Sequence, residues 1–92
     1  MKITFDPRKR LETLADRHLD FLDARLVLSG RVLTTEDTRK DYGERRFQTV
    51  GLLADRMVMV VWTPRGRVIH VISMRKCNDK EQARYGKRFE AS

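Results

Sequence analysis

Cysteine is nearly absent from this 92-residue chain, in which Cys77 is the only one. A single cysteine can form no intrachain disulfide and cannot build a thiolate metal cluster, and such sparse use is typical of a reducing compartment. We interpret Cys77 as a small, partly buried apolar residue in preference to a reactive thiol. A protein that folds without disulfides and resides in the cytoplasm is expected.

Long hydrophobic runs are also missing. The longest apolar stretch, Met57–Trp62, is far too short to span a bilayer. The first twenty residues alternate charged side chains with Leu and Ala and contain no uninterrupted apolar core, which argues against a secretory signal. The sequence therefore predicts no contact with a membrane.

The motifs of metal-dependent and nucleotide-dependent enzymes are missing too. The two histidines are not paired, and there is no glycine-rich phosphate loop and no Ser-His-Asp constellation at a recognisable spacing. We expect no metal and no cofactor. The remaining Arg, Lys, Glu and Tyr groups suit metal-independent cleavage of RNA. There the 2′-hydroxyl attacks the adjacent phosphate, while the protein moves protons and stabilises charge on the phosphorane.

Positive charge is unevenly distributed along the chain. The formal net charge is +7, and residues 64–92, with eight Lys or Arg against three Asp or Glu, account for +5 of it. Clustered basic residues bind polyanions through counterion release, whatever the sequence of the polyanion. Nucleic acid is therefore the first partner to consider, and a neutralising acidic protein is the other.

The N-terminal part of the chain predicts a short strand and two helices within one domain spanning residues 1–92. Ile3 and Phe5 alternate as in a strand, and Asp6 followed by Pro7 is a typical helix start. Gly30 is expected to end the second helix. The apolar residues at helical spacing are Leu11, Leu14, Ala15, Phe21, Ala24 and Leu28.

The central part predicts the sheet. Residues 31–35 favour an edge strand, and the highly charged segment that follows is expected to be a loop. Three runs rich in Val and Ile are separated by turn signals and predict an antiparallel meander. These runs are Phe47–Leu53, Met57–Thr63 and Arg67–Met74.

The C-terminal part predicts a helix. Asn78 and Glu81 have the spacing of a capping box, and Ala83, Tyr85 and Phe89 form a narrow anchoring stripe. The other face of this helix is basic. The fold class is thus α+β, a small antiparallel β-sheet with N-terminal helices and a C-terminal helix.

Five residues are candidates for catalysis. Arg46, Arg75 and Lys76 suit stabilisation of phosphate charge, because guanidinium forks match phosphate oxygens. Lys76 could also transfer a proton if neighbouring positive charge depressed its pKa. Glu44 is a candidate general base, although an ion pair with the arginines that follow it explains it equally well. Tyr85 is a candidate to donate a proton or to stack on a base.

A second set of residues suits contacts with RNA. These are Arg45, Arg65, Arg67, His70, Arg84 and Lys87. His70 is expected to alternate with Val68, Ile72 and Met74 on one face of a strand, where packing competes with a role in the site. His18 falls near a helix end, where capping or exposure is the common role. For the lone Arg and Lys residues, the alternative is a solvated surface or a surface ion pair.

Four segments taken together resemble the BrnT family of toxins from type II toxin–antitoxin systems. In order they read "FDPRK", "DYGERR", "VWTPRG" and "VISMRKCNDKEQARY", and the resemblance runs from Phe5 to Tyr85. Its strongest parts are the segment from Glu44 to Arg46 and the "ISMRK...E..RY" ending. The order, the spacing and the total length carry the resemblance.

The resemblance implies a RelE-like ribonuclease toxin that cleaves RNA and inhibits translation. It also implies a BrnA-type antitoxin, whose ribbon-helix-helix part would bind operator DNA, so that the toxin would meet that DNA only through its partner. The exposed hairpin edge and Trp62 would allow a dimer or an antitoxin contact. A non-catalytic module that binds RNA or protein, and a regulatory scaffold that ignores RNA, are the alternatives.

Several positions match residues that members of the family usually keep. They are Arg46, Arg75, Lys76, Glu81 and Tyr85, with Asp6 and Lys9 matching an N-terminal pattern that we interpret as structural. One segment departs from the family: where many members have Lys-His-Gly after the first helix, this chain reads Asp-Arg-His-Leu. If the usual histidine had a catalytic role, Arg17 or His18 would have to replace it.

Overall fold

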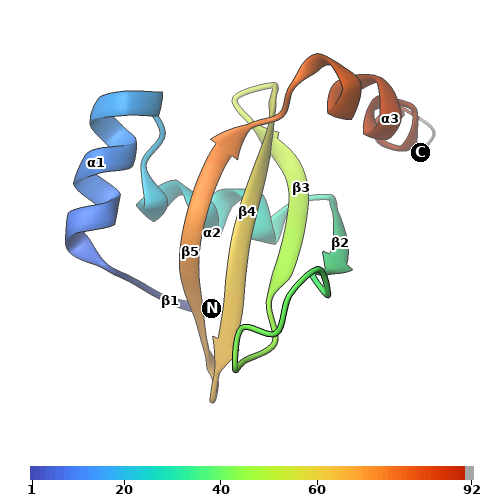
Figure 1. Cartoon of the computed structure of the whole chain (residues 1–92). Coiled ribbons are helices and arrows are strands. Elements are labelled where there is room, and N and C mark those ends of the chain that lie inside the picture. The colour runs from blue at the N-terminus through green and yellow to red at the C-terminus, as the bar shows by residue number, and fades with distance from the viewer. Residues whose placement is uncertain (91–92) are drawn as a thin grey trace.

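A five-stranded sheet organises the chain in the computed structural model, which describes residues 1–90 (Figure 1). The strands lie in the order β1-β5-β4-β3-β2. Their bounds are Lys2–Phe5 (β1), Val32–Glu36 (β2), Phe47–Leu53 (β3), Arg56–Arg65 (β4) and Val68–Lys76 (β5). The helices are Pro7–Arg17 (α1), the 3-10 turn Phe21–Asp23 (η1), Ala24–Ser29 (α2) and Asp79–Glu90 (α3). The α+β class is confirmed.

The predicted meander is confirmed, and one further strand joins it at each edge. β3, β4 and β5 pair antiparallel in sequence order, and β2 joins β3 as the expected edge strand. β1 forms the other edge by pairing parallel with β5. The sheet is therefore mixed, and the prediction of a purely antiparallel sheet is wrong. The parallel pair joins the first and the last strand of the chain.

The N-terminal helices begin where the sequence predicts. The Asp6 carboxylate accepts a hydrogen bond from the Arg8 amide at 2.9 Å, and Pro7 occupies the first turn of α1. The Asp20 carboxylate likewise accepts from the Leu22 amide, and it also binds the Arg10 guanidinium. Asp20 thus starts the second helical segment and ties it to α1.

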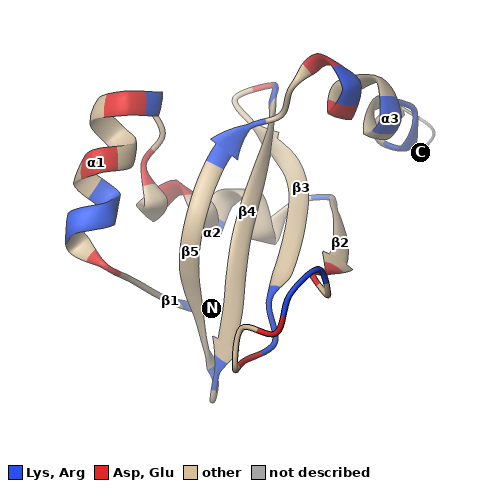
Figure 2. Cartoon of the chain, viewed as in Figure 1, with Lys and Arg blue, Asp and Glu red and all other residues tan. Residues whose placement is uncertain are grey.

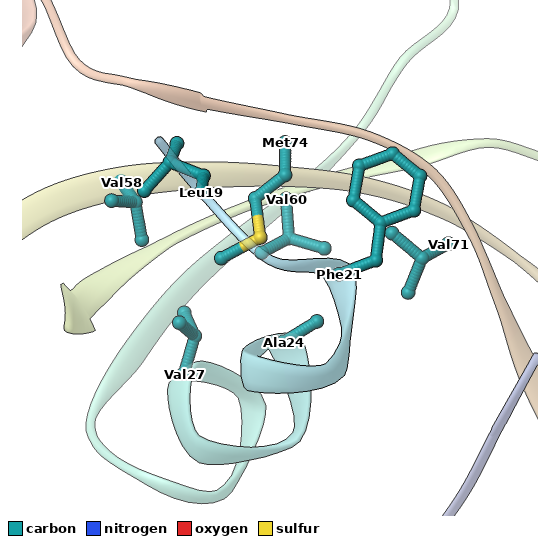
Figure 3. Packing of buried hydrophobic residues seen from close by; sticks show 8 residues of the cluster. All are labelled: Leu19, Phe21, Ala24, Val27, Val58, Val60, Val71 and Met74. Atoms are coloured by element: carbon teal, nitrogen blue, oxygen red, sulfur yellow. The ribbon is translucent and has the colours of Figure 1, made fainter. Parts of the chain in front are cut away.

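One face of the sheet, the α2 face, packs on η1 and α2 and holds the main core. Ala24 and Val27 point from α2 toward the strands, and the Phe21 ring lies beside Val71 (Figure 3). The buried cluster consists of Leu19, Phe21, Ala24, Val27, Val58, Val60, Val71 and Met74. α1 contributes no buried residue, and its predicted apolar residues Leu11 and Leu14 are exposed.

A bulge in β5 changes which side chains share a face. Val61 pairs with Ser73 but the next residue of β4 pairs with Val71, which leaves Ile72 as an extra residue. Val71 and Met74, three positions apart, therefore both enter the core of the α2 face. His70 lies on the opposite face, and its expected alternation with Met74 is wrong, because periodicity of two does not survive a bulge.

The opposite face, the α3 face, is partly covered by the C-terminal helix. Val50, Met59 and Cys77 are buried there against Tyr85 and Phe89 of α3. Burial raises the pKa of the Cys77 thiol to about 11, which keeps it protonated and confirms its packing role.

Two hydrogen-bonded ends hold α3 in place. Asn78 and Glu81 each accept from the other's backbone amide at 2.9 Å, so the predicted capping box is confirmed. At the other end, the Arg31 guanidinium donates to the carbonyls of Arg88 and Phe89. Ala83 is exposed, so that part of the predicted stripe is wrong. Within residues 1–90, no helix is long and apolar enough to cross a membrane.

Gly51 of β3 is a point where helix and sheet approach closely. A Cβ atom at Gly51 would lie 2.8 Å from Cγ1 of Val27 and 3.2 Å from Cγ1 of Val32. Gly51→Ala is therefore expected to destabilise the fold by about 1–3 kcal/mol through overpacking. Urea denaturation measures the free energy of unfolding.

The matched control is Gly86→Ala in α3, where the added Cβ would meet nothing within 4 Å. This variant is expected to be neutral or stabilising by about 0.5–1 kcal/mol, because alanine favours helices. Equal stability of the two variants would contradict the close approach of α2 to β3.

Candidate functional site

The α3 face continues toward the hairpin beyond the contacts of α3, and its residues there range from the fully buried Thr63 to the exposed Arg65. It carries Thr4, Thr63 and His70, which form one row across β1, β5 and β4, and Arg65 one row further toward the hairpin. Arg46 precedes Phe47, whose ring stacks on Trp62, so strand alternation directs Arg46 to the α3 face. We call these five residues the open half. Figure 2 shows basic residues at the hairpin and along the loop after β2.

The loop between β2 and β3 is fixed by hydrogen bonds at this end of the sheet. The carboxylate of Asp37, only 3% exposed, binds the Arg39 guanidinium at 2.8 and 2.9 Å and accepts from the Tyr42 hydroxyl at 3.0 Å. These bonds, that to Arg39 above all, hold the pKa of Asp37 well below its usual range. The Thr63 hydroxyl donates to the carbonyl of Arg45 at 2.6 Å. A charged loop is thereby held in one position.

Arg46 is held in place by an aromatic ring and a carboxylate. Its guanidinium lies 4.1 Å from the centre of the Tyr42 ring, and its Nε is 3.7 Å from the Glu44 carboxylate. This Nε is buried and has no hydrogen-bond partner among the described residues. Glu44 is also 3.7 Å from Arg65. Glu44 thus forms ion pairs, as one interpretation predicted, and its role as a base stays a prediction.

Arg75 lies on the same face, at the edge of the half that α3 covers. It pairs with Met59 in the sheet, and its guanidinium binds both carboxylate oxygens of Glu81 at 2.7 and 2.8 Å. This double hydrogen bond is the main cause that lowers the pKa of Glu81 to about 2. The Arg75 side chain is 39% exposed, so it remains accessible to a phosphate.

Lys76 does not join Arg75. It pairs with Val58 on the α2 face, because neighbouring residues of a strand point to opposite sides. There it lines a surface pocket of about 420 Å³ together with His18, Leu19 and Leu26. The structure therefore separates Lys76 from the other predicted catalytic residues.

The other predicted residues are spread over α3, the hairpin and both faces of the sheet. Tyr85 is partly buried beneath α3, with the Arg84 guanidinium 5.7 Å from the centre of its ring. Arg45 binds Glu36 at 3.0 Å and lies over the Phe47 ring. Three more predicted contacts are exposed on the hairpin and on α3, namely Arg65, Arg67 and Lys87.

His70 lies within the open half. Its Nδ1 is 3.0 Å from Oγ1 of Thr4, the residue opposite it on β1. Burial, and then the charge of Arg65, lower the pKa of His70 below its usual value. Sequence reasoning missed Thr4, because the pairing of β1 with β5 leaves no local signal. It also missed Tyr42, although Tyr42 lies in the "DYGERR" segment.

Arg17 and His18, which occupy the segment where the chain departs from the family pattern, do not reach the open half. Arg17 donates to the carbonyl of Met74 at 3.0 Å, on the side of the sheet that faces α1. His18 is the exposed C-cap of α1, with a left-handed φ of 57°. Both therefore have structural roles at the end of α1. Among the described residues, no group of three or more His, Cys, Asp or Glu side chains is arranged to hold a metal ion.

Comparison with known families identifies the family of this chain. Residues 5–81 match a family described as "Ribonuclease toxin, BrnT, of type II toxin-antitoxin system". The class is that of ribonuclease toxins with an antitoxin partner and an RNA target. The match covers most of the chain, and the chain belongs to the BrnT family. No curated protein matches it.

Glu81 is expected to make stability depend on pH in the acid range. Because its pKa falls from 4.5 to about 2 on folding, its stabilisation is complete above pH 4.5 and is lost as the pH falls toward 2. Glu81→Gln should therefore destabilise the protein by about 1 kcal/mol at neutral pH, after allowance for solvent screening, and progressively less in acid. Urea denaturation between pH 7 and pH 3 measures this.

Glu12→Gln is the matched control, because Glu12 forms an exposed 3.5 Å ion pair with Arg8 on α1. Its effect should be close to zero at every pH. An effect of Glu81→Gln that stays constant across the pH range would contradict the predicted contribution of its ionised carboxylate.

Proposed function

We propose that this protein is a metal-independent endoribonuclease that cleaves RNA through attack of the 2′-hydroxyl and so inhibits translation in the cytoplasm. The observation that carries the proposal is the grouping of Arg46, Glu44, Arg65 and His70 at one end of the α3 face. Charge stabilisation and proton transfer are the two needs of this reaction, and the group contains residues suited to both.

Arg46 is the residue proposed to stabilise the phosphorane. Stacking on Tyr42 and the ion pair with Glu44 restrict its guanidinium before RNA arrives. A guanidinium that is already ordered loses less conformational entropy when it binds a phosphate. The Arg46 side chain is 28% exposed, so it remains accessible to a phosphate.

Arg75 is proposed to bind a second phosphate of the same RNA strand. Thr63, beside Arg46, and Met59, the partner of Arg75, are four residues apart on β4. At the rise of a strand this places the two arginines roughly 13 Å apart along the sheet. An RNA backbone that follows β4 would meet both, and the hairpin arginines would extend the basic track.

The partner is proposed to be a BrnA-type antitoxin with a ribbon-helix-helix part that binds operator DNA. Membership of the BrnT family supports an antitoxin partner in general, and the net charge of +7 supports an acidic or amphipathic covering segment. Operator DNA would then be bound only through the antitoxin, in a complex that includes a dimer. Likeness to RelE belongs to the same proposal.

A non-catalytic RNA-binding module is the second candidate. It is favoured by the engagement of two groups predicted to transfer protons, since Glu44 faces two arginines and Tyr85 is packed beneath α3. Such a module would bind RNA in a salt-sensitive way and would not cleave it.

Arg46→Ala is expected to slow RNA cleavage by about 10²–10³-fold, because it removes a preorganised donor at the reacting phosphate. The measurement is incubation of the antitoxin-free protein with total RNA in excess chelator. The charge-matched control is Arg25→Ala, at an exposed position of α2. The control should retain the parent rate.

If the parent leaves free RNA intact, the same comparison on translating ribosomes distinguishes a ribosome-dependent nuclease from the binding module. Salt-sensitive binding without cleavage in both assays would contradict the ribonuclease proposal. Equal losses in the two variants would contradict the place assigned to Arg46.

A further inference from the structure

The open half needs a group that removes the proton of the 2′-hydroxyl. Glu44 lies 3.7 Å from both Arg46 and Arg65, so its carboxylate already neutralises two cations. Tyr85 is partly buried in the cluster beneath α3, and Lys76 lies on the other face of the sheet. His70 is the remaining titratable group among the described residues of the open half that can accept a proton near neutral pH.

The sheet register brings His70 and Thr4 together. The parallel pairing of β1 with β5 sets Thr4 opposite His70, and Thr4 Oγ1 lies 3.0 Å from His70 Nδ1. Because the two ring nitrogens are on different sides of an imidazole, a bond at Nδ1 leaves Nε2 for another partner. A proton on Nδ1, donated to the Thr4 hydroxyl, leaves a basic lone pair on Nε2.

The surroundings keep the imidazole neutral at physiological pH. Burial lowers the pKa of His70, and the positive charges of Arg65 on the hairpin and Lys9 on α1 lower it further. Glu44 of the loop and Asp6 before α1 act in the opposite direction without overcoming these effects. The uncharged form, which is the form that can accept a proton, therefore predominates.

We propose that His70 is the general base of the ribonuclease reaction and that Thr4 is a positioning residue that holds the proton on Nδ1. This rests on the proposed function, which it deepens by naming the base. The pairing of His70 with Thr63 puts His70 on the face of Arg46, the bulge at Ile72 puts Arg75 on that face as well, and β1 supplies the hydroxyl that orients His70.

The reaction balances without an additional reactant other than water. Nε2 of His70 takes the proton of the 2′-hydroxyl as O2′ forms its bond to phosphorus, and the bond from phosphorus to O5′ breaks. O5′ takes a proton from water, and the imidazolium returns its proton to the hydroxide left behind. The products are a 2′,3′-cyclic phosphate and a 5′-hydroxyl, with no net change in protons.

The first test compares cleavage rates and pH profiles. His70→Gln should slow cleavage by about 10²–10⁴-fold, while His18→Gln, at the exposed end of α1, should keep the parent rate. Thr4→Val should slow cleavage roughly tenfold and move the acid limb of the profile, and Thr4→Ser should restore both. All variants should bind an RNA that lacks the attacking 2′-hydroxyl as tightly as the parent does.

Cleavage by His70→Gln at the parent rate would overturn the assignment of the base while leaving the ribonuclease proposal intact. A Thr4→Val variant with an unchanged profile would overturn the role of Thr4. A parent protein that cleaves neither free RNA nor RNA on ribosomes would overturn the proposed function itself.

A second measurement does not depend on activity. Nitrogen-15 NMR of the imidazole reports which ring nitrogen holds the proton, and a pH titration reports the pKa. We expect the proton on Nδ1 in the parent and a pKa below the ordinary histidine value. A proton on Nε2 in the parent would overturn the proposal whatever the cleavage assays show.

Discussion

The extra residue in β5 decides the chemistry of both faces of the sheet. Without the bulge at Ile72, strand periodicity would place Met74 on the side of His70 and would direct Arg75 toward α2. With it, Val71 and Met74 complete the core, while His70 and Arg75 both face away from that core. The core and the candidate site are therefore products of one irregularity in the hydrogen-bond ladder.

The bulge is also a feature of the fold that local sequence patterns do not predict. The helix starts at Asp6 and Asp20, the meander and the capping box of Asn78 and Glu81 follow from local patterns, and each was predictable. The parallel pairing of β1 with β5 was not, because it joins residues 66 positions apart in the chain. The grouping of Thr4 with His70 depends on that pairing, and the placement of His70 and Arg75 on one face depends on the bulge. Neither has a local signal.

The candidate site was predictable in part. Arg46 and Glu44 are neighbours in the chain, and the structure places both beside Arg65. Lys76 follows Arg75 in sequence but faces the opposite side, since side-chain direction in a strand depends on register and not on composition.

Asp37 shows how the charged loop becomes ordered. A single buried carboxylate binds Arg39 and Tyr42, although no apolar pattern predicts order there.

The attachment of α3 has a mechanical consequence. Two arginine side chains from distant parts of the sheet bind this helix. Arg75 of β5 binds Glu81 in its first turn, and Arg31, just before β2, binds backbone carbonyls in its last turn. β4 and β3 separate β5 from β2, so the helix links two parts of the sheet that are not neighbours. Force on α3 would therefore pass to two separate parts of the sheet, through the Arg75–Glu81 ion pair at one end and the Arg31 hydrogen bonds to backbone carbonyls at the other. The hydrophobic contacts of Tyr85 lie between these two attachments, and those of Phe89 lie at the second, so polar contacts fix the ends of the helix and apolar packing holds the part between them.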